Sequence, residues 1–281
     1  LTLPVLFLMI SNHYPLAFGT GHVPAIVALV LVVGATIRHF FNSRHAGKPT
    51  PWWTWGVAVA GVAGIIWLSA LGPNADAVVA TGASIVDMDF FEGLGHKHYQ
   101  ALEVPDDDTL RSLYIDRIYD TYIDEEQLQD CDFTINAIAN SLEPKAYSSR
   151  AFIREMGKYL VEHGKKENSL VKLAYEHDVP IFCPAFTDSS AGFGLVRHQV
   201  DRMKAGEPYL MIDAVADFRE LTEIKIKAGT TGLFMIGGGV PKNFIQDTVV
   251  CAEILGHEDV EVHKYAVQIT VADVRDGACS S

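Results

Sequence analysis

GTTGLFMIGGGVPKNFIQDTVVCAEILG, residues 229–256, predicts one strand, one turn and one helix in direct succession. The apolar run at 233–236 is typical of a buried parallel strand. Gly237, Gly238 and Gly239 follow it, and Pro241 suits the first turn of a helix that ends at Gly256. Such a turn can receive a phosphate or a dinucleotide at its backbone N–H groups, or it can be a tight connection without a ligand. The spacing is not G-x-G-x-x-G, so the motif leaves both interpretations open.

The composition divides the chain near residue 75 into two domains, 1–75 and 76–281. The first contains three of the 22 basic residues, all four tryptophans and none of the 35 acidic residues. The second contains all 35 acidic residues and all four cysteines. Its acidic balance argues against nucleic-acid binding, which requires clustered Lys and Arg, and is compatible with a cationic substrate.

Two long, mainly apolar segments in the first domain predict transmembrane helices at about 23–41 and 52–72. Tryptophans at the start of the second segment suit a membrane interface. Arg38, Arg44 and Lys48 lie between the uncharged runs 23–37 and 49–75 of these segments, so the positive-inside rule places this loop in the cytoplasm. The alternative is a pair of buried core helices. The sequence therefore predicts a membrane localisation for the chain as given.

Two motifs in this domain are MISNHYPL at 9–16 and IRHFFNSRHAGKPTPWWTWG at 37–56. With them, residues 1–75 resemble the membrane portion of the bacterial membrane-bound urate oxidase family. In a complete helical bundle of that family, His13, His22, His39 and His45 could ligate a haem or a metal. With two helices alone, we interpret them as loop and interfacial histidines.

Residues 76–281 alternate predicted strands and helices. Strands are expected at 76–82, 179–183, 233–236 and 265–270. Helices are expected from Thr109, at 149–164, at 168–178 and at 213–227. This alternation predicts a Rossmann-like parallel sheet with helices on both faces. The fold class is therefore α/β, preceded by an all-α two-helix transmembrane segment.

The turns that follow the four predicted strands should meet at one edge of the sheet, because parallel strands end there together. These turns are 81–87, 185–192, 237–243 and 272–277. Three of them carry an acid, namely Asp87, Asp188 and Asp276, which could accept ribose hydroxyls or an ammonium group. For any one of these acids the alternative role is helix capping. Four similar turns at one edge favour a cofactor site.

No metal site is expected. The cysteines at 131, 183, 251 and 279 lack the C-x-x-C spacing and indicate neither zinc binding nor a disulfide framework. Asp106–Asp108 and the pair His96 and His98 are weak metal motifs, and a solvated loop is the better interpretation of both.

Four motifs in the second domain carry a second resemblance: DRIYDTYIDE at 116–125, VPIFCPAFTDSSAGFG at 179–194, AGTTGLFMIGGGVPKNF at 228–244 and YAVQITVADVRDG at 265–277. With them, residues 76–281 resemble the deoxyhypusine synthase family, and the homospermidine synthase-like branch in particular. The resemblance implies NAD as cofactor, spermidine as donor of an aminobutyl group, and an acceptor amine that is a protein lysine or a diamine. It also implies a cytoplasmic homo-oligomer for the intact family.

The resemblance assigns roles residue by residue. The NAD-binding positions that it implies are Thr81, Gly82, Ala83, Asp188, Gly237, Gly238 and Asp276. Asp87 matches an acid that binds polyamine nitrogen. Asn243 stands at a substrate position where protein-modifying members have a histidine, and Phe193 replaces a polyamine-binding aspartate. Both changes favour a divergent amine-transferring branch over an ordinary deoxyhypusine synthase.

The family's catalytic lysine has no counterpart before Ser281, so no catalytic residue is assigned and this copy is expected to be inactive. Its N-terminal NAD-binding segment has no counterpart either. We interpret the chain as a junction of two truncated proteins near residue 75. The alternatives are a membrane-tethered amine transferase, a non-catalytic membrane-anchored remnant, and a fragment of a membrane urate oxidase.

Overall fold

The computed structural model describes residues 6–11, 75–100, 106–118 and 120–279. The expected transmembrane spans at 23–41 and 52–72, and His13, His22, His39 and His45, lie outside these residues. Within the described ranges, no helix is both long enough and apolar enough to cross a membrane.

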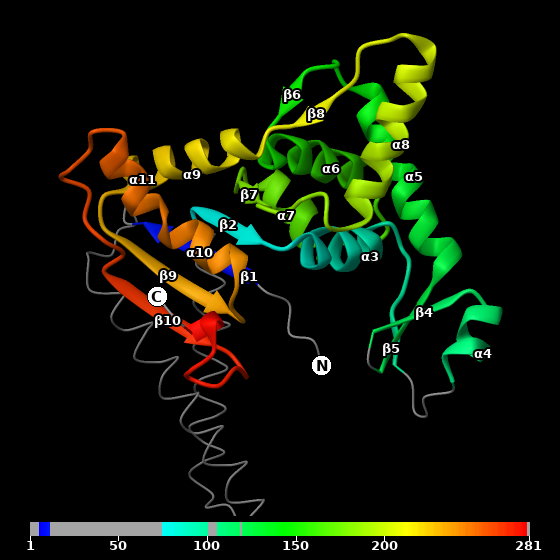
Figure 1. Ribbon diagram of the computed structural model, residues 1–281, viewed down its shortest axis with the longest axis horizontal. Helices are drawn as coiled ribbons and strands as arrows, with labels where there is room; N and C mark the ends of the chain where they lie inside the picture. The colour runs from blue at the N-terminus through cyan, green and yellow to red at the C-terminus, as the bar shows by residue number, and fades with distance from the viewer. Residues whose placement is uncertain (1–5, 12–74, 101–105, 119, 280–281) are drawn as a thin grey trace, which may run out of the picture.

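The main sheet has five strands in the order β10-β9-β1-β2-β7 (Figure 1). They are β1 (Leu6–Ser11), β2 (Ala77–Ala80), β7 (Ile181–Phe182), β9 (Thr231–Ile236) and β10 (Tyr265–Ile269). All four strands expected in 76–281 are therefore present, although β7 is shorter than its sequence pattern indicated.

The expectation of an all-parallel sheet is wrong in one respect. β2 pairs in parallel with β7, and β9 pairs in parallel with β10, but β1 lies between the two pairs and is antiparallel to both β2 and β9. β1 was not expected, because its residues precede segments predicted to be membrane helices. Since β2 and β9 both oppose β1, they run in the same direction, and all four parallel strands still end at one edge.

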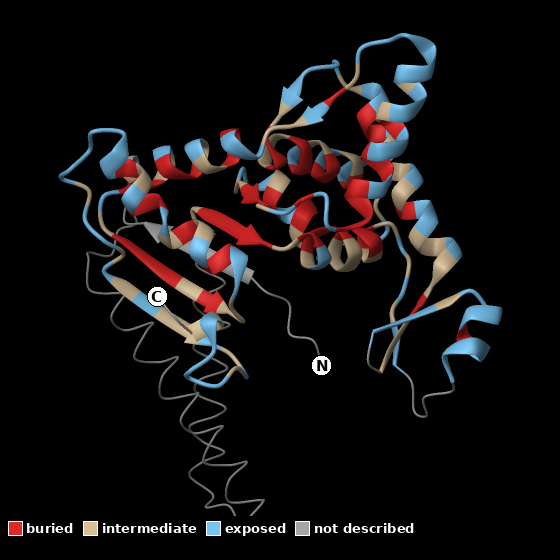
Figure 2. Ribbon diagram, viewed as in Figure 1, coloured by how far each residue is buried: buried red, intermediate tan, exposed pale blue. Residues whose placement is uncertain are grey.

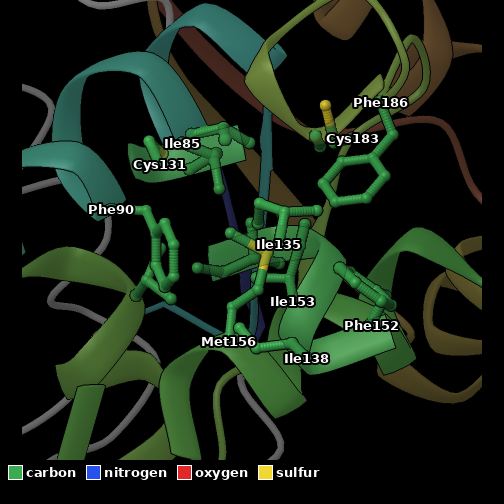
Figure 3. Close-up of a cluster of buried hydrophobic side chains, with 14 of the residues drawn as sticks. Ile85, Phe90, Cys131, Ile135, Ile138, Phe152, Ile153, Met156, Cys183 and Phe186 are labelled. Atoms are coloured by element: carbon green, nitrogen blue, oxygen red, sulfur yellow. The ribbon is translucent and has the colours of Figure 1, made fainter. Parts of the chain in front are cut away.

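β2 is buried on both faces, which explains its unbroken apolar sequence. Val78 and Ala80 contribute to a large core with η1, α5, α6, α7 and α8, whereas Ala77 and Val79 contribute to a smaller core with α9 and α10. Figure 2 shows these buried segments on either side of the sheet. Figure 3 shows the larger core, in which Phe152 meets Phe186 edge to face at a centroid distance of 5.7 Å.

The helices begin and end at residues suited to those positions. α6 (Ser149–His163) has Ser148 as its N-cap and Gly164 as its C-cap, and α9 (Ala214–Ala228) has Asp213 and Gly229. α7 (Leu170–Glu176) is capped by Ser169. These three helices were expected from the sequence. The predicted helix after the glycine turn is divided into α10 (Val240–Gln246) and α11 (Thr248–Ile254).

Several elements were not expected. These are η1 (Ala83–Phe90), a π-helical segment continued by α3 (Phe91–Gly93), and the long helices α5 (Glu125–Ser141) and α8 (Ser190–Ala205). Two small sheets accompany them, β3-β5-β4 (Tyr99–Gln100, Thr121–Asp124, Ile115–Ile118) and β6-β8 (Ala146–Tyr147, Met211–Ile212). α4 (Asp107–Ser112) is the helix expected from Thr109 and begins two residues earlier, and a short 3₁₀ turn, η2 (Gly277–Cys279), completes the described fold.

Candidate functional site at the carboxyl edge of the sheet

The site expected from the sequence divides into two pairs of turns along one edge of the sheet. The turns after β2 and β7 form one pair, and those after β9 and β10 form the other. β1 lies between the pairs, so β2 and β9 are two strand spacings apart, about 10 Å. The sequence patterns predicted that all four turns lie at this edge, but they did not predict the separation between the two pairs.

The first pair is held together at Gly82. A Cβ added there would lie 2.7 Å from the Ser189 Cβ and 3.1 Å from the Asp188 carbonyl oxygen, so only glycine fits. This contact brings the sequence-predicted residues Thr81, Gly82 and Asp188 together. Thr81 Oγ1 lies 3.2 Å from Ser84 Oγ, while Ala83 and Asp188 are exposed beside it.

Asp87 connects η1 to the start of α8. Its Oδ1 accepts a hydrogen bond from the Ser190 backbone N–H at 2.8 Å. Burial raises the pKa of this carboxyl, and the nearby charge of Asp188 adds to that effect, whereas the bond from Ser190 acts in the opposite direction. Asp87 thus caps the start of α8, which is the alternative role predicted for this acid from the sequence. It does so at the edge of the sheet where the amine site was expected.

Asp132, on α5, is a fourth acid at this edge that sequence reasoning missed. Its Oδ1 is shielded from solvent and has no hydrogen-bond partner among the described residues. Burial raises the pKa of Asp132, and the charge of Asp87 adds to the increase, while a side-chain hydrogen bond with Ser190 opposes it. One sequence feature could have identified Asp132: it lies beside Cys131 and Ile135, which are buried positions of an amphipathic helix.

The second pair of turns contains the glycine run. Gly237 and Gly239 have φ angles of +87° and +89°, which other residues rarely adopt. Gly238 is required for another reason, because a Cβ there would lie 2.5 Å from the Ala278 Cβ. The Gly237 N–H donates to the Ile269 carbonyl oxygen at 2.8 Å, which fastens this turn to the end of β10.

Lys242 and Gln268 connect the two turns of this pair through hydrogen bonds. Lys242 is 2% exposed, and its Nζ donates to the Gln268 side-chain oxygen at 3.2 Å and to the Ala278 carbonyl at 3.4 Å. Gln268 Nε2 donates to the carbonyl oxygens of Gly237 and Ala278, both at 2.7 Å. The structure therefore brings the glycine turn and the 277–279 turn together, with a buried cation between them.

The remaining sequence-predicted residues are exposed at this edge. Asp276 Oδ1 accepts the Ala278 backbone N–H at 2.8 Å, so this acid orders its own turn. Asn243 lies on α10, one helical turn beyond Gly239. Phe193 is 68% exposed near the start of α8, in contrast to the acid that the resemblance implies there.

The weak metal motifs have structural roles. Asp106 caps α4 through its bond from the Thr109 N–H at 3.0 Å. His98 contacts Glu92 and the Asp87 carbonyl oxygen, each at 3.1 Å. Across the described ranges, no group of three or more His, Cys, Asp or Glu side chains is placed to hold a metal ion.

Two family models match the chain. The deoxyhypusine synthase model matches residues 56–281, and the urate oxidase N-terminal model matches residues 1–69. The second match supports the resemblance found for the first part of the sequence.

Curated relatives agree with the first of these matches. A deoxyhypusine synthase-like protein of Caulobacter vibrioides is 74% identical over 207 residues, which are 73% of this chain and 56% of the relative. A protein of the same description from Coxiella burnetii is 73% identical over 207 residues, covering 73% and 58%. One from Chlorobaculum parvum is 64% identical over 205 residues, again covering 73% and 58%.

The chain thus spans somewhat more than half the length of these relatives. The matched family model nevertheless covers most of its residues, including every turn at the carboxyl edge of the sheet. The chain therefore belongs to the deoxyhypusine synthase family.

Proposed function

We propose that residues 76–281 contribute to an NAD-dependent transferase that moves an aminobutyl group from spermidine to an acceptor amine, as in deoxyhypusine or homospermidine synthases. The observation that carries this proposal is the pair of carboxylates Asp87 and Asp132. Both are partly buried, both have raised pKa values, and Asp132 has an oxygen without a described partner. A cationic amine would supply the missing donor and would favour the ionised form of both acids.

The arrangement of the four turns supports the proposal of NAD as the cofactor. Gly239 has open space where a side chain would lie, and Gly237, with its positive φ, leaves the end of β9 without a side chain. The exposed carboxylates of Asp188 and Asp276 suit ribose hydroxyls. When bound as NAD⁺, this cofactor would supply a hydride acceptor for oxidation of the carbon next to an amine nitrogen. The roles proposed for the chain are to hold the ribose groups at Asp188 and Asp276 and to support the turn through Gly237 and Gly238.

The amine is proposed to bind beside the β2 and β7 turns. Asp87 and Asp132 would attract its ammonium group, and exposed Phe193 would pack against its methylene chain. Asn243 lies on the other pair of turns and would contact the amine as a neutral hydrogen-bonding group. This division assigns the charged end of the substrate to the first pair of turns and its uncharged reacting region to the space between the pairs.

Binding titrations test the proposal directly. Calorimetry should give saturable binding of NAD⁺ and of spermidine to the purified chain. Asp188→Asn should weaken NAD⁺ and Asp87→Asn should weaken spermidine, each by about tenfold, the equivalent of one lost charge-assisted hydrogen bond. Asp201→Asn, an exposed acid on α8, is the matched control.

Asp87 also caps α8, so each variant is first compared with the wild type by thermal unfolding. Unchanged spermidine affinity in folded Asp87→Asn and in Asp132→Asn would contradict the amine site. Absence of NAD⁺ binding by the wild-type chain would contradict the cofactor site.

We also propose that this part of the chain is a cytoplasmic homo-oligomer. Phe193, Val196, Val200 and Met203 form an exposed apolar stripe on α8, with exposed fractions of 68, 63, 41 and 62%. Their 3-4-3 spacing is the same in both directions, so the stripe can pair with a second copy in antiparallel orientation.

Light scattering after size-exclusion chromatography tests this surface. Val196→Glu should lower the measured mass to that of a smaller assembly, whereas Val215→Glu, at an exposed apolar position of α9, should leave it unchanged. A wild-type monomer, or an oligomer unaffected by Val196→Glu, would contradict the assignment of the stripe.

A further inference from the structure

A cavity of about 260 Å³ lies at the opposite edge of the sheet from the candidate site. Its walls come from the first turns of α6, from α7, from the connection 178–180 and from α9, where Glu220 contributes. Pro180 and Ile181 mark the amino end of β7, and the candidate site lies beyond the carboxyl end of the same strand. The cavity is therefore separate from the residues assigned to NAD and spermidine.

The rim of the cavity carries two cations and two anions. Arg150 and Arg154 lie four residues apart on α6, so they share one face of the helix. Arg150 Nη1 donates to Glu220 Oε2 at 3.3 Å, and Arg154 Nη1 donates to Asp178 Oδ1 at 2.6 Å. The Arg154 guanidinium also lies over the ring of Tyr175 at 5.1 Å from its centroid.

Each rim group keeps hydrogen-bonding capacity. A guanidinium has five N–H donors, and only one donor of Arg150 and one of Arg154 has a bond within the described ranges. Glu220 Oε1 and Asp178 Oδ2 likewise accept no hydrogen bond from a described residue. Both ion pairs are partly exposed, with side-chain exposures of 42 and 25% for Arg150 and Glu220, and 53 and 85% for Arg154 and Asp178. Such pairs contribute little to stability and can rearrange around a ligand.

The floor of the cavity is apolar. Ile153, Val171 and Ile181 line it and are 1–3% exposed in the folded chain. A ligand with an apolar body would bury its own apolar surface in the cavity and make van der Waals contacts with these side chains. The volume lies slightly below the range of about 300–1,000 Å³ that is typical of sites for drug-sized ligands, so the ligand is expected to be small.

The charge balance of the rim selects among small ligands. A ligand with only an anionic group would pair with the arginines but would face the carboxylates of Glu220 and Asp178. A ligand with only an ammonium group would have the reverse difficulty. A zwitterion satisfies both kinds of rim group and adds no net charge to the cavity.

We propose that this cavity binds a small apolar α-amino acid. Its carboxylate would bind to Arg150 and Arg154, its ammonium group would bind to Glu220 and Asp178, and its side chain would pack on the floor formed by Ile153, Val171 and Ile181.

Calorimetric titration of the purified full chain tests this proposal with three matched probes. L-leucine carries both charges, 4-methylpentanoate lacks the ammonium group, and 3-methylbutylamine lacks the carboxylate. L-leucine should bind saturably, and each single-charge analogue should bind at least about tenfold more weakly, because each can contact only two of the four rim groups. Equal affinity for all three probes, or no saturable binding of L-leucine, would overturn the proposal.

Two variants locate the binding. Ala151→Leu places a larger side chain in the lining and should abolish L-leucine binding, and Arg154→Gln should weaken it by about tenfold. Both should leave NAD⁺ affinity unchanged, which separates this site from the candidate site at the other edge. L-leucine affinity unchanged in both variants would show that the ligand binds elsewhere. If either variant fails to fold, the comparison of the three probes on the wild type still tests the proposal.

Discussion

Replacing Asp132 by Asn should stabilise the fold while weakening amine binding. Asp132 Oδ1 is shielded from solvent and unpartnered among the described residues, and the carboxylate lies close enough to Asp87 for the two charges to repel. An ionised group in this position is costly, since its shielded Oδ1 loses hydration without gaining a donor. An amide of the same shape removes the charge and keeps an acceptor for the Ser190 hydroxyl.

The expected gain is about 1 kcal/mol at pH 7. The amide still lacks a partner at the shielded position, so the gain comes from removing the charge beside Asp87. Repulsion between two unit charges a few ångströms apart is about 1 kcal/mol in water and several times larger near a protein surface, and the lower value applies because the Asp132 side chain is partly exposed. For a folded unit of about 200 residues, this stabilisation corresponds to an increase in Tm of about 2–4 °C.

The gain should depend on pH in a defined direction. The pKa of Asp132 in the folded chain is raised above its ordinary value of 3.8, so the folded state favours the protonated acid. Below pH 3.8 the carboxyl is protonated and does not lower the free energy of unfolding of the wild type. As the pH rises through the folded pKa, the carboxyl ionises and this free energy decreases. The difference between Asp132→Asn and wild type should be near zero at pH 4 and should increase towards pH 7.

Thermal unfolding followed by circular dichroism from pH 4 to pH 8 measures this difference. Asp130→Asn, two residues away on α5 and exposed, should show no comparable trend. A Tm for Asp132→Asn below that of wild type at pH 7, or a difference that is independent of pH, would refute the interpretation of Asp132 as an uncompensated acid.

Three further changes have defined outcomes. Gly238→Ala should cost about 1–3 kcal/mol in a chemical unfolding titration, because its Cβ would meet Ala278 at 2.5 Å; no loss would mean that the two turns are not in contact. The carboxylate of Asp217 is fully buried and accepts two backbone N–H groups at the start of α6, although burial raises its pKa. Asp217→Asn should therefore also destabilise the fold by about 1–3 kcal/mol, and a stabilised variant would contradict this. Burial lowers the pKa of His263 to about 4. The free energy of unfolding of the wild type should therefore fall as the pH falls from 6.5 to 4, and that of His263→Gln should fall less steeply over the same range.

The sequence was sufficient where local patterns and caps decide the structure. The apolar runs of β2 and β9 are continuous because both strands are buried, and Ser148, Asp213 and Gly229 mark helix ends through their own chemistry. The glycine turn and the common edge of the strands followed from the same patterns. These features also located the residues of the candidate site.

The sequence was insufficient where distant segments decide the structure. β1 enters the sheet between β2 and β9, and its apolar residues resemble those of the predicted membrane segments that follow. The acid Asp132 comes near Asp87 because α5 packs against α8, where a Cβ at Gly194 would lie 2.5 Å from the Asp132 carbonyl oxygen. Periodicity within one segment carries no information about either contact.

Hydrogen exchange of the purified chain with and without NAD⁺ tests the central proposal most directly. If the carboxyl edge of the sheet holds the cofactor, NAD⁺ should slow exchange at 81–90, 186–192, 237–243 and 270–279, and should leave the cavity residues 150–154 and 174–181 unchanged. Protection confined to other segments, or no protection at saturating NAD⁺, would contradict the assignment of this edge as the cofactor site.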